Sequence, residues 1–249
     1  MSSEHRGFLK WLYAFIPLHI GNGIILFAMQ CFRFFQRHGF VYAASHFDLN
    51  LKGFSVLKEE EPAIFDRFIE CQNRLNCLYL GMSTMDKAGC EVIAVYNALT
   101  AFDIADRSLP KLIESFEKDG IMHSGKYGVS VNAMKDALKK AGLKVDLTSR
   151  KDKMKALFEK SKVMILTMYN DKKDLGQQVH SVMIESVDGK TDVKASDEER
   201  TESAGKEYLV HNMYGDGRVM GPYHDWDDML NRLRDGKTGP ISLMGIDKM

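Results

Sequence analysis

The sequence predicts an α+β fold in which helices come first and an antiparallel sheet follows. The first observation is the segment from Cys90 to Phe102, which is apolar on nearly every side and therefore typical of a buried helix. The second is a series of short apolar runs after residue 160, at residues 163–168, 181–186 and 208–213. Turn residues separate these runs, which is typical of strands in an antiparallel sheet.

The other elements are expected from local signals in chain order. An acidic run before Pro62 and apolar residues at helical spacing predict a helix within residues 62–80. Two further helices are expected, one from Ser108 to about Lys118 and one capped by Ser130 and stopped at Gly142. The remaining expectations are an exposed polar hairpin at residues 191–205, a last helix at 226–233 and a closing strand at 241–246.

The bulk composition limits the classes of function. The 249 residues carry 34 positive and 34 negative side chains and are 45% hydrophobic, which are ordinary values for a globular protein. No Lys/Arg stripe stands out, so a nucleic-acid partner is not expected. The four cysteines lack metal-ligand spacing, and two of them, Cys71 and Cys77, fall in the expected helix on opposite faces. Free thiols, with no metal and no cofactor, are expected.

The N-terminal part, residues 1–75, is expected to be an apolar and helical extension to a domain at residues 76–249. Residues 8–35 are long enough to span a bilayer, but Pro17 and the glycines at 21 and 23 break a spanning helix. Three interpretations stay open, namely an extension that packs on its own domain, membrane contact through residues 8–40, and a pro-segment that blocks the cleft. A secretory signal fits poorly, so a cytoplasmic or membrane-associated location is expected over a secreted one.

Cysteine chemistry is expected at Cys90, which follows a glycine and opens the buried helix. A helix N-terminus and a neighbouring imidazolium both stabilise a thiolate. His180 begins a predicted strand, and Asn212 ends the next one, where it can orient an imidazole. His211 competes for the third role, but strand alternation points it to the opposite face from Asn212.

These segments together resemble a known family. The run Gly89-Cys90-Glu91-Val-Ile-Ala-Val-Tyr-Asn-Ala-Leu is similar to the nucleophile motif of the double-glycine peptidases that process bacteriocin leaders, a papain-like branch of cysteine peptidases. Residues 128–145, 163–168, 180–189 and 208–212 are similar to its later landmarks, so the resemblance covers about residues 80–246. It implies a papain-like fold, a Cys90–His180–Asn212 triad and a thiol hydrolase acting on a peptide or protein substrate without a cofactor.

The chain departs from the family in the segment before the cysteine. The family places a Gln there to bind the oxyanion, whereas residues 81–86 contain neither Gln nor Asn. Ser83 or Thr84 is the expected replacement donor, beside the Cys90 amide. Three hypotheses therefore stay open: a thiol hydrolase, a catalytically silent binding or membrane-associated module, and an acyl transferase of the same fold. His224 with Asp216 and Asp225 is interpreted as a solvated loop and not as a metal site.

Overall fold

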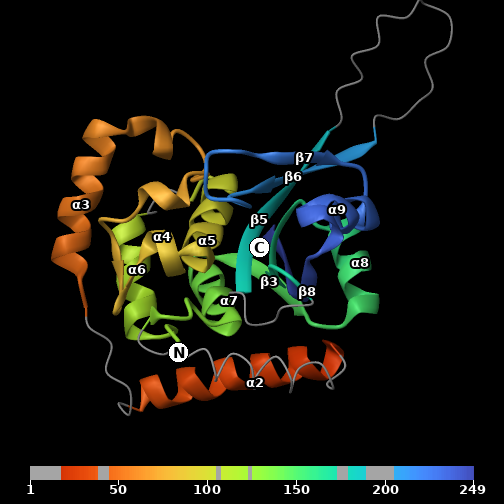
Figure 1. Cartoon of the computed structure of the whole chain (residues 1–249), viewed down its shortest axis with the longest axis horizontal. Coiled ribbons are helices and arrows are strands. Elements are labelled where there is room, and N and C mark those ends of the chain that lie inside the picture. The colour runs from red at the N-terminus through yellow and green to blue at the C-terminus, as the bar shows by residue number, and fades with distance from the viewer. Residues whose placement is uncertain (1–17, 39–44, 105–107, 123–124, 173–178, 189–204) are drawn as a thin grey trace, which may run out of the picture.

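The computed structural model describes residues 18–38, 45–104, 108–122, 125–172, 179–188 and 205–249. Within these residues the main sheet is antiparallel throughout, with the strand order β3-β8-β4-β5-β6-β7 (Figure 1). The chain therefore has the expected α+β architecture. The strands are β3 Leu143–Thr148, β4 Val163–Tyr169, β5 Val179–Asp188, β6 Lys206–His211, β7 Met220–Tyr223 and β8 Gly239–Lys248.

Helices cover both faces of this sheet. One face packs against α5 Cys90–Ala101 and α7 Val131–Lys140, with α6 Leu109–Lys118 beyond them, and the other packs against α8 Lys151–Lys160 and α9 Trp226–Arg232. Side chains alternate along β5 between these two layers. Met183 joins the core around α5, whereas Val182 and Ile184 join the core beneath α8 and α9. This alternation decides which residues of β5 face the cysteine helix.

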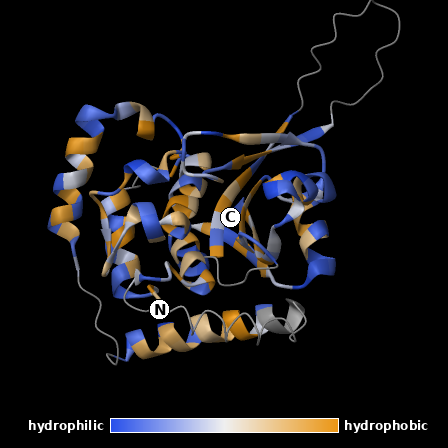
Figure 2. Ribbon diagram, viewed as in Figure 1, coloured by the Kyte–Doolittle hydropathy of each residue, from blue (hydrophilic) through white to orange (hydrophobic). Residues whose placement is uncertain are grey.

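Helix α5 is the centre of the larger core. Every residue from Cys90 to Thr100 is buried, as its lack of a polar face predicts. Figure 2 shows hydrophobic residues concentrated in this helix and in the central strands, whereas the outer helices alternate between hydrophobic and hydrophilic residues. The N-terminus of a fully buried helix is thereby held in a fixed position against the sheet.

The N-terminal extension packs on the rest of the chain. Helix α2 Leu18–Arg37 contributes Met29 to the large core, and α3 Phe47–Glu60 contributes Leu57. A buried hydrogen bond joins Asn22 Nδ2 to the carbonyl of Pro240 at the start of β8 (3.0 Å). Among the described residues, no helix combines the length and the apolar character that crossing a membrane requires.

Most expected elements are confirmed, including the Ser130 cap, whose hydroxyl accepts from the Ala133 amide (3.3 Å). The prediction of a helix within residues 62–80 is wrong. That stretch holds two short 3₁₀ turns, η1 Pro62–Phe65 and η2 Gln72–Arg74, and then the strand β1 Tyr79–Leu80. The physical reason is a distant contact, because the Asn97 side chain on α5 binds both the amide and the carbonyl of Ile69. Those main-chain groups are thus removed from a helical hydrogen-bond ladder.

Several other elements differ from expectation. The helices α3 and α8 and the strands β3 and β7 were not predicted from local signals, and the polar hairpin expected at 191–205 lies almost wholly outside the described residues. Cys71 and Cys77 are free thiols, although neither lies in an α-helix as expected. Trp226 packs α9 against α8, with its ring 5.4 Å from that of Phe158.

Candidate functional site

Cys90 lies at the first turn of α5, on the wall of a cavity of about 160 Å³. The thiol side chain is buried, and it forms a hydrogen bond with the main chain of Ser181 on β5. Apolar residues of α2, namely Ile25, Ala28, Met29 and Phe32, form the opposite wall. The predicted nucleophile therefore faces a partly open, mostly apolar space between α2 and the body of the fold.

The next residue, Glu91, dominates the electrostatics of this cavity. Its side chain is 2% exposed and lines the same cavity as Cys90. Burial raises the pKa of the Glu91 carboxyl to about 7, although hydrogen bonds with the Cys90 thiol and the Val129 amide oppose this shift. Burial and the neighbouring carboxyl in turn raise the pKa of the Cys90 thiol well above its usual range. The resting cysteine is thus a neutral thiol in contact with a carboxyl group that titrates near neutrality.

His180 does not contact Cys90 in this structure. Ser181 touches the cysteine, so alternation along β5 turns the His180 ring to the α8 and α9 face of the sheet. There its Nε2 donates to the main-chain carbonyl of Asn212 (2.9 Å). Burial lowers the pKa of His180 to about 4, and the positive charge of Arg234 adds to that effect. The imidazole is therefore neutral, and the expected thiolate–imidazolium pair is not formed here.

Asn212 meets His180 through its main chain and not through its carboxamide. It follows the last residue of β6 and adopts a left-handed backbone (φ 59°), which turns its carbonyl toward the imidazole. Its side-chain Nδ2 instead donates to Gln72 Oε1 (2.9 Å). The two residues are neighbours as the strand pattern predicts, but the contact between them differs from the expected one.

Gln72 connects this turn to the segment before the cysteine. It is buried, and its Nε2 donates to the carbonyls of Met85 (3.1 Å) and Asp86 (3.2 Å). The sequence pattern did not identify Gln72, because it precedes residues 81–86, the stretch in which the family places its Gln. Ser83 and Thr84, the expected oxyanion donors, form the short strand β2 Ser83–Thr84 and are not among the residues lining the cavity at Cys90. They are separated from Cys90 by α4 Met85–Ala88.

A second titratable cluster lies further along the α5 face of the sheet. His211 Nδ1 is 2.5 Å from Glu70 Oε1, and its Nε2 is 3.3 Å from Glu185 Oε1. Burial alone would lower the pKa of His211, but these two carboxylates raise it overall. Glu70 also accepts from the Asn212 amide (2.5 Å), so this cluster fixes the left-handed turn beside His180. No local sequence signal identified Glu70 or Glu185.

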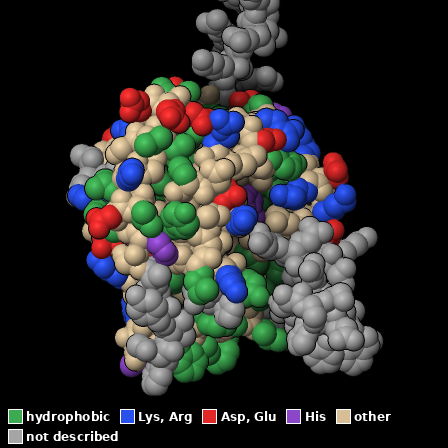
Figure 3. All heavy atoms as spheres, turned by 60° about the vertical axis from the view of Figure 1, so that its left-hand side comes forward, with side chains coloured by type: hydrophobic (Ala, Val, Ile, Leu, Met, Phe, Trp, Pro, Cys, Tyr) green, Lys and Arg blue, Asp and Glu red, His purple; other side chains and the backbone are tan. Residues whose placement is uncertain are grey.

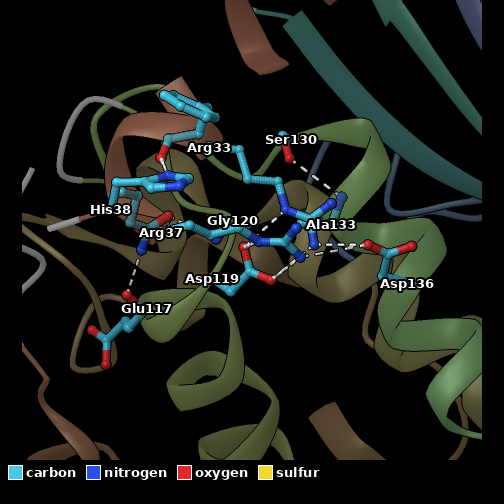
Figure 4. Close-up of polar contacts among 11 residues, drawn as sticks. Arg33, Arg37, His38, Glu117, Asp119, Gly120, Ser130, Ala133 and Asp136 are labelled. Atoms are coloured by element: carbon cyan, nitrogen blue, oxygen red, sulfur yellow. Dashed lines mark hydrogen bonds and ion pairs between the residues drawn. The ribbon is translucent and has the colours of Figure 1, made fainter. Parts of the chain in front are cut away.

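Ion pairs hold α2 over the cavity. Arg33 reaches both Asp119 and Asp136 at 2.8 Å, and its side chain is only 6% exposed (Figure 4). Gln36 adds hydrogen bonds to the Glu117 carbonyl and the Gly120 amide. Figure 3 shows hydrophobic side chains on the surface at the lower edge of the molecule, where α2 lies in Figure 1. The exposed apolar residues of α2 are Ile24, Phe27, Phe34 and Phe35.

The described residues contain no cluster of His, Cys, Asp and Glu suited to a metal ion. Asp216 pairs with Arg218, and Asp225 caps α9 by accepting from the Asp228 amide, so the local roles of these two carboxylates are structural. No protein-family model, no curated protein and no solved structure matches this chain.

Proposed function

We propose that this protein is a thiol hydrolase of papain-like architecture that cleaves a peptide or amide bond with Cys90 as nucleophile. The observation that carries the proposal is the position of Cys90 at the first turn of a buried helix, facing a cavity and touching a buried carboxyl. A structural cysteine has no need of a polar neighbour, whereas Cys90 forms a hydrogen bond with the Glu91 carboxyl. The family resemblance around Cys90 supports the same reaction.

The order of the elements also supports the papain-like part of the proposal. The cysteine helix α5 packs on β5, which carries His180 near its start, and the neighbouring strand β6 leads directly into Asn212. In such an enzyme the sulfur attacks the carbonyl carbon to form a thioester, and water then releases the acid. The apolar cavity favours a substrate with a hydrophobic side chain beside the cleaved bond.

A catalytically silent binding module is the second candidate, and a specific observation favours it. The His180 ring lies on the far face of the sheet from Cys90, and the pKa of the thiol is raised rather than lowered. A domain that only binds a ligand needs neither a thiolate nor a nearby base. Binding would then use the same cavity without any covalent step.

Hydrolysis by the full-length protein separates these candidates. Wild type and Cys90→Ala are compared on a pool of peptide p-nitroanilides with apolar side chains, and Cys77→Ala is the matched control because Cys77 is an exposed free thiol. The hydrolase proposal predicts turnover that is abolished in Cys90→Ala and unchanged in Cys77→Ala. Turnover that survives the loss of Cys90 contradicts it, and no turnover in wild type, with retained peptide binding, favours the silent module.

A further inference from the structure

The buried carboxyl of Glu91 lacks a complete set of hydrogen-bond partners. Its Oε2 atom is buried and has no hydrogen-bond partner within the described structure. An unsatisfied buried carboxylate oxygen is costly, and a native fold retains one only where something offsets that cost. The side chain lines the cavity at Cys90, so a molecule in the cavity can reach this carboxyl.

The backbone around Glu91 makes room for the carboxyl. Gly128 lies in the loop before α7 with φ 73°, and a Cβ added there would lie 2.3 Å from Glu91 Oε2. A side chain at position 128 would therefore push the carboxyl out of its place beside the thiol. The adjacent Val129 amide donates to the carboxyl and fixes its direction.

We infer that Glu91 is the acid–base residue that serves Cys90, a role the sequence pattern had given to His180. This inference rests on the proposed hydrolase function. Glu91 already forms a hydrogen bond with the thiol, whereas the His180 ring binds the Asn212 carbonyl on the other face of the sheet. A carboxyl group whose pKa lies near 7 is well matched to proton transfer at neutral pH.

Glu91 alone can carry the proton through every step of the hydrolysis. The Glu91 carboxylate takes the thiol proton as the sulfur bonds to the substrate carbonyl carbon. The resulting carboxylic acid then protonates the amine as the C–N bond breaks, which leaves a thioester. The carboxylate next removes a proton from water as the oxygen attacks the thioester. Finally the C–S bond breaks and the proton returns to the sulfur.

Few other charged groups face Cys90 and Glu91. Lys87 on α4 and Lys126 in the loop before α7 line the same cavity, as does the Tyr127 side chain. The part of α2 that lines the cavity contributes only apolar side chains, and β5 contributes Val179. A rise of the acylation rate with an apparent pKa near 7 (the pH limb) therefore reports the ionisation of Glu91.

The test is the burst of p-nitrophenol released when the full-length protein is acylated by p-nitrophenyl acetate between pH 5 and 8.5. We expect the wild-type burst rate to rise with an apparent pKa near 7 and His180→Ala to keep that limb. Glu91→Gln should lose the limb and acylate roughly 10²-fold more slowly at pH 7.5. Glu91→Asp keeps a carboxyl and should retain the limb at a reduced rate, which excludes misfolding as the cause.

The outcomes distinguish the two proposals. If Cys90→Ala removes the burst while Glu91→Gln leaves the rate and its pH limb intact, the hydrolase stands and the role of Glu91 is refuted. Loss of the limb in His180→Ala together with its retention in Glu91→Gln also refutes that role. A burst that persists in Cys90→Ala overturns the proposed function itself and the inference that rests on it.

Discussion

Replacing Glu91 by Gln should stabilise the protein at neutral pH while leaving its stability in acid almost unchanged. Glutamine has nearly the same shape, so it preserves the packing beside Gly128 and removes only the ionisable group. Burial raises the pKa of the Glu91 carboxyl from 4.5 to about 7, so the folded state binds this proton more tightly than the unfolded state does. Stability must therefore fall as pH rises through this window.

The size of the effect follows from the same two values. Each pKa unit corresponds to 1.36 kcal/mol, so ionising Glu91 in the folded state costs about 3 kcal/mol at most. The cost is absent below pH 4.5 and complete above about pH 7. We expect the free energy of unfolding of Glu91→Gln, relative to wild type, to increase by about 3 kcal/mol across this range.

Urea unfolding of both proteins at several pH values from 4.5 to 8 measures this difference. Other titrating groups, including the His211 cluster, are common to the two proteins and cancel in the comparison. The same pair of proteins in a Cys90→Ala background shows whether the thiol contributes. A difference between the variants that does not change with pH would refute the raised pKa of the buried Glu91 carboxyl.

Two further predictions concern the contacts that hold the fold around the site. Arg33→Met removes the part-buried ion pairs that join α2 to Asp119 and Asp136, so amide hydrogen exchange in α2 and alkylation of Cys90 should both accelerate. Arg37→Met is the exposed control, and equal effects of the two variants would contradict this role of Arg33. Asn97→Leu leaves the amide and carbonyl of Ile69 without their partner, and urea unfolding should show a loss of about 3 kcal/mol. A loss below 1 kcal/mol would mean that the segment before Gln72 refolds around the change.

The sequence was sufficient to predict those elements whose local residue pattern agrees with their burial in the fold. Helix α5 is apolar on all sides and is fully buried, Ser130 caps α7, and the apolar runs after residue 160 form β4, β5, β6 and β8. These elements depend on side-chain periodicity and on capping, which act within a few residues. For this reason the position of Cys90 at a helix start was predictable.

The geometry of the site was not predictable, because it depends on contacts between distant segments. The face on which His180 lies is set by the register of β5 in the sheet, and a shift of one residue would reverse it. The role of Gln72 depends on a turn that Asn97 stabilises from α5. No local pattern singled out Glu91, and only the approach of the Gly128 loop shows that it is buried beside the thiol.

The central claim is that Cys90 is the nucleophile, and peptide mass spectrometry of the acylated protein tests it most directly. Full-length wild type is mixed briefly with p-nitrophenyl acetate at pH 7.5, quenched in acid and digested. The free thiols Cys31, Cys71 and Cys77 serve as internal controls, since each is more exposed than Cys90. We predict that the acetyl group is found on Cys90 ahead of all three. Acetylation of Cys77 and surface lysines, with Cys90 unmodified, would contradict the claim.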